Sequence, residues 1–380
     1  MRLVEIRVSG FRNLVPTAVS WAAAGNLVAG ANGQGKTNLL EAVTVLGNLR
    51  SFRTATMRQI VRHGESRFFL EGRVETGNGP VRISQEVSVG PPVRRVLHVA
   101  GAAVSVAQYL RVFPVFALSG ADRELVVGGP AERRSYLDRH TFLLEKDYFD
   151  EIRQFKNVLR QRNAALANAV SDREMEAWED RLARAAAVVV MRRQHSCREL
   201  IRGFQPIYRD LRGRDFPDLE LHYRGEAAFE PAEKVQKLEE YYRKRYNETR
   251  TRDRRTGFTG EGPHRHDLGL RADGRSVRQT LSSGQVKVVA AALRLASLQQ
   301  VERERNEHLP VIIDDVDAEL DGAVLSRLIG HLTGDRQLFL SSADERLSHK
   351  MKPGSSRIEV RRGTVFEAAG ERLDERRLHS

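Results

Sequence analysis

The chain has 380 residues, a formal net charge of +12 and a pI near 10.1, so it is long enough for two or three domains and a sizeable core. Its longest apolar run, 185–191, is too short to span a membrane, and its one cysteine, Cys197, excludes an intrachain disulfide and a cysteine metal cluster. We therefore expect a cytoplasmic protein without a membrane partner, and the excess positive charge suggests an anionic polymer as partner.

The first residues alternate apolar and charged side chains, which predicts a first strand rather than a signal peptide. A short apolar run at 27–29 predicts another strand, followed by Gly30 and, after four residues, by Gly35, Lys36 and Thr37. This is the spacing of a P-loop. Apolar residues at helical spacing come next: Leu39, Leu40, Val43, Leu46 and Leu49. Strand, glycine loop and helix together predict a working phosphate-binding loop.

The predicted ligand of this loop is ATP with Mg²⁺. Glycines let successive N–H groups turn inward to the phosphates, Lys36 reaches the β- and γ-phosphates, and the Thr37 hydroxyl ligates Mg²⁺. The predicted nucleotide-binding residues of the loop are Gly30, Ala31, Asn32, Gly33, Gln34, Gly35, Lys36, Thr37 and Asn38.

Two regions of different character follow. The stretch 68–89 contains two alternating runs joined by Gly77, Asn78 and Gly79, and the runs 93–99 and 104–106 flank a turn at Ala100 and Gly101, which predicts an antiparallel β layer. From 131 to 255 the sequence is charged and helical in its apolar spacing. A helix of about 30 residues there would span roughly 45 Å.

The second informative cluster lies near the C-terminus. The pentapeptide Leu281–Gln285 precedes a helical pattern, and the apolar run 309–313 predicts a strand that ends in Asp314 and Asp315. A strand ending in a carboxylate beside a P-loop is the Walker B arrangement, so Asp314 would hold Mg²⁺ and Asp315 would orient or deprotonate the attacking water. The segment Ala318, Glu319, Leu320, Asp321 matches a D-loop, in which we expect Asp321 to contact the nucleotide. A strand at 337–340 ends in Ser341 and Ser342, where we expect a γ-phosphate sensor at Ser342.

These motifs predict an α/β fold: an ABC-type P-loop ATPase head with an antiparallel β layer and an inserted α-helical lobe. The strands that carry Lys36 and Asp314 are expected to be neighbours in one sheet. We expect the head at 1–130 and 256–370, the lobe at 131–255 and a disordered tail at 371–380. In this architecture Ser282, Ser283, Gly284 and Gln285 face the ATP of a second subunit, which predicts a homodimer. The predicted catalytic residues are Asp315, Lys36 and Ser282.

The motifs resemble those of the RecF family, relatives of the SMC-type ABC ATPases, over nearly the whole chain. The similar stretches are Phe11-Arg12-Asn13, GANGQGKTNLLEAV from Gly30, Arg50 to Thr54, ERRSYLDR from Glu132, LRQRNAAL from Leu159, GPHRHDL from Gly262, LSSGQ, and DDVDAELD from Asp314. The chain departs from the family pattern at Val286, where a second glutamine is usual, at Phe52, where a histidine is usual, and at His266, where an acid is usual.

The resemblance implies ATP-dependent dimerisation, slow DNA-stimulated hydrolysis and binding at boundaries between single- and double-stranded DNA. It implies a role in SOS-linked gap repair and replication, in which such proteins help to load a RecA-like recombinase with RecO- and RecR-like mediators. It also implies that Arg12 and Asn13 lie near the nucleotide base.

Three other interpretations are open to test. A nucleotide-binding subunit of an ABC transporter is disfavoured by the long inserted lobe, and a small-molecule kinase leaves LSSGQ and the D-loop unexplained. A metal site at His264 and His266 is disfavoured because isolated histidines usually have structural roles or bind anions.

The basic run between 243 and 255 is the predicted DNA contact, with Arg252, Arg254 and Arg255 as its candidate residues. The alternative for such a run is a solvated helix end. The arginines between 50 and 62 are the next candidates.

Overall fold

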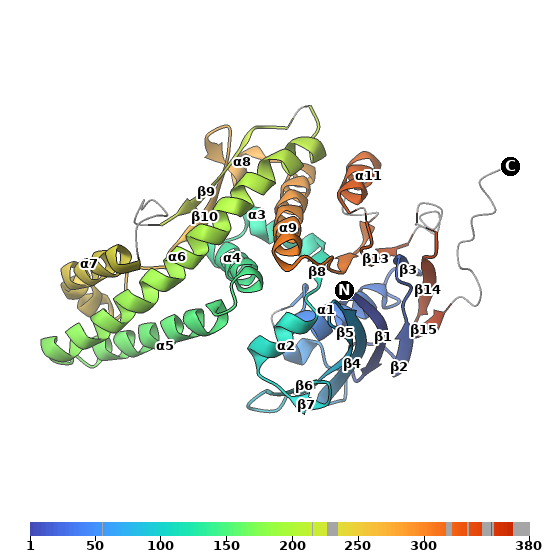
Figure 1. The fold of residues 1–380 in the computed structure, drawn as a ribbon, viewed down its shortest axis with the longest axis horizontal. Helices are drawn as coiled ribbons and strands as arrows, with labels where there is room; N and C mark the ends of the chain where they lie inside the picture. The colour runs from blue at the N-terminus through green and yellow to red at the C-terminus, as the bar shows by residue number, and fades with distance from the viewer. Residues whose placement is uncertain are drawn as a thin grey trace. The chain divides into compact units, whose positions relative to one another are not determined.

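We describe the protein from a computed structural model, which describes residues 1–54, 56–214, 216–225, 235–316, 321–332, 334–343, 351 and 353–367 (Figure 1). The predicted tail at 371–380 and the D-loop residues Ala318, Glu319 and Leu320 lie outside these residues. The chain forms two compact units, one of Met1–Asp122 with Asn306–Ser380 and one of Arg123–Arg305.

The first unit contains the predicted antiparallel β layer, a six-stranded sheet in the order β2-β1-β4-β5-β6-β7. Its strands are β1 (Arg2–Ser9), β2 (Thr17–Ser20), β4 (Arg67–Thr76), β5 (Gly79–Ser88), β6 (Arg94–Val99) and β7 (Ala102–Ala103). The hairpin between β4 and β5 turns at Gly77 and Asn78, as predicted.

One detail of this layer was predicted wrongly. The strand after the turn at Ala100 is Ala102–Ala103, not 104–106, and Val106 begins helix α2 (Val106–Val112). Ser105 explains the difference, because its hydroxyl accepts from the Gln108 amide while Gln108 Oε1 accepts from the Ser105 amide. This capping box starts a helix where apolar alternation alone indicated a strand.

The second sheet of this unit has the order β15-β14-β3-β13-β12-β8, and all its pairings are parallel except that of β14 with β15. Its strands are β3 (Gly25–Ala29), β8 (Phe116–Leu118), β12 (Val311–Ile313), β13 (Leu338–Ser342), β14 (Ser356–Arg361) and β15 (Thr364–Glu367). The P-loop strand β3 and the Walker B strand β12 share this sheet, but they are not neighbours as we expected. Strand β13 lies between them, so the C-terminal end of β13, at Ser341 and Ser342, borders both the P-loop and the Walker B residues.

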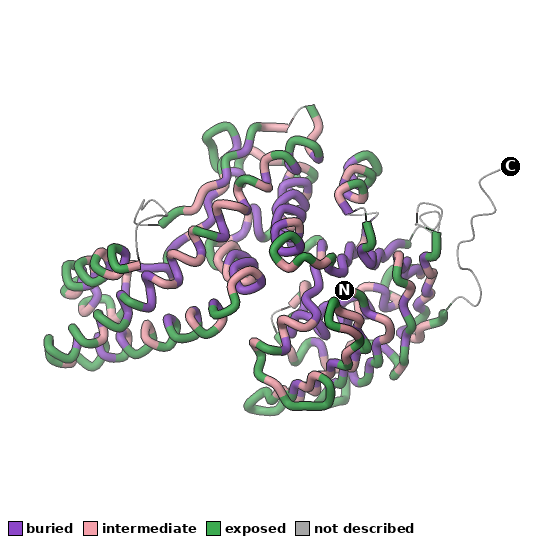
Figure 2. Tube along the Cα trace, in the orientation of Figure 1, coloured by how far each residue is buried: buried purple, intermediate pink, exposed green. Residues whose placement is uncertain are grey.

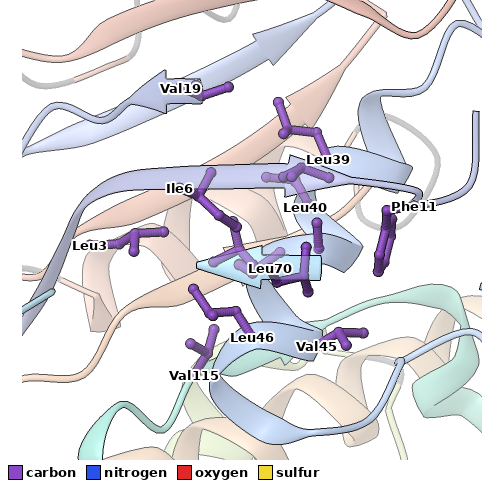
Figure 3. Close-up of a cluster of buried hydrophobic side chains, with 14 of the residues drawn as sticks. Leu3, Ile6, Phe11, Val19, Leu39, Leu40, Val45, Leu46, Leu70 and Val115 are labelled. Atoms are coloured by element: carbon purple, nitrogen blue, oxygen red, sulfur yellow. The ribbon is translucent and has the colours of Figure 1, made fainter. Parts of the chain in front are cut away.

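Helix α1 (Lys36–Asn48) lies between the two sheets, and 11 of its 13 residues are buried. Figure 3 shows its Leu39, Leu40, Val45 and Leu46 within a cluster that also contains Leu3 and Ile6 of β1 and Leu70 of β4. The same cluster contains Val28 of β3 and Phe339 of β13. Because residues on nearly every side of α1 are buried, including the polar Glu41, Thr44 and Asn48, other elements enclose the P-loop helix from both faces. The remaining short elements of this unit are η1 (Met57–Gln59), η2 (Gly120–Asp122) and α11 (Gly322–His331).

The second unit is mainly helical, with α3 (Arg123–Val127), α4 (Pro130–Leu144), α5 (Tyr148–Ala167), α6 (Asp172–Leu211), α7 (Val235–Thr256), α8 (Val277–Thr280) and α9 (Ser283–Arg305). Helix α6 packs against α5, α7 and α9, and with 40 residues it is longer than the predicted 30. Figure 2 shows α9 buried along most of its length.

A three-stranded antiparallel sheet completes the second unit, with β9 (Leu219–Arg224), β10 (Asp267–Ala272) and β11 (Arg275–Ser276) in the order β11-β10-β9. Strand β9 falls in a stretch that we predicted to be helical. The unit also includes α9 and β10, which we predicted to belong to the ATPase head. Arg133 of α4 forms an ion pair with Asp267 of β10 at 2.8 Å, which joins segments of this unit that are far apart in the sequence. The predicted division into an ATPase head and an inserted lobe stays a prediction, because the two compact units are defined by packing and not by function.

Candidate functional site

The P-loop connects β3 to α1 and has the backbone that its glycines allow. Gly30, Gly33 and Gly35 have φ angles of 143°, 79° and 119°, in the region that favours glycine. A Cβ atom at Gly30 would lie 2.5 Å from the carbonyl oxygen of Val360, so any other residue would clash there. Helix α1 begins at Lys36 with no side-chain cap and no acidic residue in its first turn among the described residues. Its first N–H groups are therefore available to an anion.

Lys36 folds back over this loop. Its Nζ donates hydrogen bonds to the carbonyl oxygens of Gly30 (2.6 Å) and Ala31 (3.1 Å) and to Asn32 Oδ1 (3.3 Å). The ammonium group is thus held at the mouth of the loop by neutral acceptors. Phosphate oxygens are stronger partners for an ammonium group than neutral carbonyls, because both partners are then ionised. The predicted role of Lys36 in binding the β- and γ-phosphates stays a prediction.

The two residues predicted to hold Mg²⁺ meet in the structure, although 277 positions separate them. Thr37 Oγ1 donates to Asp314 Oδ1 at 3.0 Å. Burial raises the pKa of the Asp314 carboxyl above its ordinary value, and the hydrogen bonds from Ser341 and Thr37 oppose that shift. One buried carboxylate beside one hydroxyl fits Mg²⁺, which keeps several waters and is bound by one or two protein ligands plus phosphate oxygens.

Ser341 is a site residue whose role the sequence analysis missed. Its Oγ donates to Asp314 Oδ1 at 2.7 Å and accepts a hydrogen bond from the Asp315 amide at 2.7 Å. Ser341 therefore fixes both carboxylate residues from the intervening strand β13. The predicted sensor, Ser342, is fully buried at the end of the same strand.

The two other acidic candidates differ in their surroundings. Asp315 has a φ of 52°, a left-handed conformation that non-glycine residues seldom adopt, directly after the buried Asp314. Asp321 caps helix α11, because its Oδ1 accepts from the amides of Ala323 at 3.0 Å and Val324 at 2.8 Å. The structure thus gives Asp321 a role as a helix cap, and its predicted contact with nucleotide stays a prediction.

Glu41 organises the loops beside the P-loop, and nothing in the sequence pattern singled it out. It is fully buried on α1, where Oε1 and Oε2 accept from Arg12 Nη2 at 2.7 Å and Arg12 Nε at 2.9 Å. The Ser51 hydroxyl donates to the same carboxylate. Arg12, which has a φ of 51°, is therefore anchored to the P-loop helix by a bidentate ion pair.

Asn13 and Asn38 extend this network on the exposed side. Asn38 Nδ2 donates to Asn13 Oδ1 at 2.7 Å, and Arg53 Nη1 donates to Asn38 Oδ1 at 2.7 Å. The segments at Arg12, Asn38 and Arg53, which are far apart in the sequence, thus meet beside the start of α1. The position of Arg12 and Asn13 near the nucleotide base, which the resemblance implies, stays a prediction.

The turn between β14 and β15 also contacts the P-loop. The Arg362 amide donates to Gln34 Oε1 at 2.7 Å, and the Gly363 amide donates to the Gln34 carbonyl oxygen at 2.8 Å. A Cβ at Gly363 would lie 2.0 Å from the carbonyl oxygen of Asn13, so glycine is required there. Both the side chain and the backbone of Gln34 are therefore hydrogen-bonded to the turn between β14 and β15, and this turn holds the P-loop in place.

The pentapeptide Leu281–Gln285, which we call the signature loop, lies in the second unit, at the start of α9. Ser282 and Gln285 cap this helix reciprocally: Gln285 Oε1 accepts from the Ser282 amide at 2.9 Å, and Ser282 Oγ accepts from the Gln285 amide at 3.3 Å. Ser282, Ser283 and Gly284 are exposed, whereas Val286 is buried. The side chain that departs from the family pattern thus faces the core of the unit, and the exposed part of the loop keeps the predicted residues.

His264 and His266 have protein partners. His264 Nε2 contacts the Thr259 carbonyl oxygen at 3.0 Å, and His266 lies between the hydroxyls of Tyr223 (2.6 Å) and Tyr242 (3.2 Å). Within the described ranges, no group of three or more His, Cys, Asp or Glu side chains could hold a metal ion. These contacts favour structural roles for both histidines.

The predicted DNA-contacting arginines lie in the last turns of α7 and differ in their partners. Arg252 Nη2 lies 3.4 Å from Glu261, and Arg254 Nη2 lies 2.8 Å from Asp172. Arg255 is exposed and makes no ion pair with a described residue. Arg254 Nη2 also donates to the Val170 carbonyl oxygen at 3.0 Å, and the Glu261 side chain is only 14% exposed, so a phosphate would have to replace protein partners at Arg252 and Arg254.

No helix among the described residues combines the length and the apolar character that a membrane crossing requires.

Comparison with known proteins gives a consistent result. The model of the RecF/RecN/SMC N terminal domain family matches residues 2–365. The chain is 32% identical over 372 residues to the DNA replication and repair protein RecF of Anaeromyxobacter sp. (strain K), with 96% of this chain and 99% of the relative covered. It is 30% identical over 380 residues to the RecF of Vibrio cholerae serotype O1 (strain ATCC 39541 / Classical Ogawa 395 / O395), with 96% and 99% covered. Neither relative is a transporter subunit.

Solved structures agree with these matches. A structure described as the recombination mediator protein RecF-ATP in the RecFOR pathway superposes with a TM-score of 0.87 at 27% identity, with 97% of each chain covered. An SMC head bound to the C-terminal winged-helix domain of ScpA gives a TM-score of 0.56 at 13% identity, with 98% of each chain covered, which shows a shared fold alone. The fold is thus that of an SMC-like ABC ATPase head, and the chain belongs to the RecF family.

Proposed function

We propose that this protein is an ATP-dependent DNA-binding protein of replication and repair. It binds Mg²⁺ and ATP at the P-loop, dimerises on ATP, hydrolyses it slowly, and binds boundaries between single- and double-stranded DNA. The observation that carries the nucleotide part of the proposal is the contact of Thr37 with Asp314 at 3.0 Å beside the glycine loop. Membership of the RecF family supports the DNA part, together with the net charge of +12.

Each site residue has a distinct task in this proposal. The glycine loop and the start of α1 bind the phosphates, and Lys36 exchanges its loop acceptors for the β- and γ-phosphate oxygens. Thr37 and Asp314 would hold Mg²⁺, which neutralises charge on the phosphates. Asp315 would position or deprotonate the attacking water, and Ser341 keeps both acidic residues in place. Arg12 and Asn13, fixed by Glu41 and Asn38, would contact the nucleotide base.

Dimerisation is the natural use of the exposed signature loop. Ser282, Ser283 and Gly284 present a helix N-terminus, which attracts phosphate. In the proposed dimer each loop meets the ATP of the other subunit, so ATP is buried between two protomers and hydrolysis releases them. ATP therefore acts mainly as an association switch.

We expect Ser282→Arg to prevent ATP-dependent dimerisation, because a bulky cation would occupy the place of the partner's phosphate. Light scattering with and without ATP measures this directly. Ser282→Asp should prevent it as well, since aspartate keeps the helix cap but repels phosphate. The matched control is Ser276→Arg, at another exposed serine of the same unit whose side chain does not cap its helix. A monomer in ATP for the unmutated protein would contradict the dimer proposal.

DNA binding is tested most directly by comparing gapped, duplex and single-stranded oligonucleotides with ATP, ADP and no nucleotide. We expect the gapped substrate with ATP to bind best. RecO- and RecR-like mediators and a RecA-like recombinase are the proposed partners, and they should associate with the gapped DNA complex. Equal binding to all three substrates would contradict the boundary preference but leave the nucleotide site unaffected.

The triple change of Arg252, Arg254 and Arg255 to alanine should weaken DNA binding and reduce its dependence on salt, while ATP binding without DNA stays intact. Each phosphate contact contributes about −0.9 to the slope of log affinity against log salt. The slope should therefore fall by about 2.7 if all three arginines contact phosphate, and by about 0.9 if Arg255 alone does. The matched control is the triple alanine variant of Arg67, Arg73 and Arg82. These arginines lie on β4 and β5 of the antiparallel sheet, and their side chains are each more than half exposed. An unchanged slope would move the DNA surface to the arginines between 50 and 62.

A further inference from the structure

Phe258 is the most exposed large apolar residue among the described residues of the second unit, at 44%. It follows α7, two residues after the helix ends at Thr256. The guanidinium carbon of Arg265 lies 5.4 Å from the centroid of its ring. The ring is thus covered by a cation on one side and still presents nearly half of its residue surface to solvent.

The chain on either side of Phe258 is firmly anchored. The Gly257 amide, at a φ of 76°, donates to the Asp253 carbonyl oxygen at 2.8 Å and ends the helix. Thr259 is 1% exposed, and its amide donates to Asn163 Oδ1 at 2.9 Å. The fully buried Arg162 donates to Thr259 Oγ1 at 2.7 Å and to Asp253 at 3.0 Å. Phe258 is therefore held outward by a rigid backbone, so ordering it on binding would cost little conformational entropy.

The charges around this turn favour an anion. The acidic residues of the segment 252–265 are Asp253 and Glu261, and both already form ion pairs with arginines. Asp253 is fully buried against Arg162, and Glu261 accepts two hydrogen bonds from Arg245, at 2.6 and 2.8 Å. Arg255 and Arg265 are exposed and make no ion pair with any residue that the structure describes. The exposed ring thus carries one cation, Arg265, and follows a second, Arg255, by three residues, and neither makes an ion pair with a described residue.

Single exposed apolar residues are common and need no partner. Phe258 differs from the other exposed phenylalanine that carries an arginine, Phe366, which is 47% exposed with Arg361 at 5.9 Å. Arg361 is paired with Glu359, through two hydrogen bonds of 2.6 and 2.9 Å. Arg265, over the Phe258 ring, has no such acidic partner among the described residues, so the ring and the charge are both available to one ligand.

We propose that Phe258 and Arg265 form a stacking platform for the first unpaired base at a single-strand/double-strand boundary, with Arg255 contacting a neighbouring phosphate. Aromatic rings beside arginines bind single-stranded nucleic acid without reading its sequence, because every base has a π face. The platform deepens the proposed function and rests on it. It accounts for a boundary preference that phosphate contacts alone cannot provide, since those are equally present on duplex DNA.

The test uses the full-length protein with ATP and a gapped duplex that carries 2-aminopurine at the first unpaired position. Phe258→Ala should weaken binding to this DNA by about 5- to 150-fold, the range expected for losing one base stack. Binding to a fully paired duplex should stay unchanged, and the 2-aminopurine fluorescence change on binding should disappear. Phe258→Trp should preserve both signals, since tryptophan keeps a stacking surface.

Two further variants make the outcome decisive. Phe258→Leu keeps an apolar side chain but lacks a π face, so it should behave like Phe258→Ala while its melting temperature and ATP binding stay normal. Phe366→Ala is the matched control and should bind gapped DNA like the unmutated protein. Equal affinity of Phe258→Ala and the unmutated protein for gapped DNA would overturn the platform. If the unmutated protein itself fails to prefer gapped over duplex DNA, the proposed boundary function is wrong instead.

Discussion

Replacing Lys36 with methionine is expected to lower ATP affinity by about 100-fold or more. Two charge-assisted hydrogen bonds, to the β- and γ-phosphates, are each worth about 1.5–3 kcal/mol, and 1.4 kcal/mol corresponds to a tenfold change in affinity. Methionine has a similar length and no charge, so it removes these bonds with little change in volume. Calorimetric titration with ATP and Mg²⁺ measures the loss.

The structure indicates that this variant should fold normally. The acceptors of Lys36 in the nucleotide-free loop belong to Gly30, Ala31 and Asn32, which are partly or fully exposed, so water can replace the ammonium group. An unchanged melting temperature should therefore accompany the loss of ATP binding. Lys156→Met, at a side chain that is 66% exposed on α5, is the control and should bind ATP normally. If Lys36→Met keeps full ATP affinity, the P-loop assignment is wrong.

The parts of the site that could be predicted are those encoded in contiguous sequence. The P-loop needs glycines at positive φ, a preceding strand and a following helix, and all of these signals fall between 25 and 48. The signature loop likewise appears as a short pattern that opens an apolar helix, and α9 begins there, at Ser283. Local backbone requirements of this kind restrict which residue types can occupy each position, so they remain visible in a single sequence.

The parts that escaped prediction depend on contacts between distant segments. Ser341 contacts Asp314 only because β13 inserts between β3 and β12, and no local pattern fixes the order of strands in a parallel sheet. Glu41 looked like an ordinary polar position of the P-loop helix, although it is buried against Arg12 and Ser51. A charged residue on a helix is usually exposed, and its burial is recognisable only when its partners are known.

The basic run near the end of α7 shows the same limit for electrostatics. In sequence the run has few acidic neighbours, whereas in the structure Asp172 and Glu261 approach it from other segments. Phe258 was not singled out at all, because one phenylalanine after a helical pattern carries no signal until its exposure and the position of Arg265 are known. Charge counted along the chain therefore overestimates the charge that a ligand would meet.

Asp315→Asn is expected to slow ATP hydrolysis by about 10²- to 10⁴-fold, because removing a residue that positions or activates the attacking water typically costs this much. The substitution is unusually clean here. Asp315 is left-handed, with a φ of 52°, and asparagine tolerates that conformation as well as aspartate does. The hydrogen bond from its amide to Ser341 Oγ, 2.7 Å long, involves the backbone and should persist.

The expected phenotype is a protein that binds Mg²⁺ and ATP normally but remains in its ATP-bound dimer, which light scattering and single-turnover hydrolysis would show together. Asp314→Asn is the matched comparison, since Asp314 is the residue that contacts Thr37 at 3.0 Å and Ser341 at 2.7 Å. It should weaken the Mg²⁺ dependence of ATP binding, because a neutral amide is a poorer ligand for a hard cation than a carboxylate. The opposite pattern, with Mg²⁺ binding lost in Asp315→Asn and kept in Asp314→Asn, would exchange the two roles. If both variants hydrolyse ATP at the normal rate, the group that activates water is neither Asp314 nor Asp315.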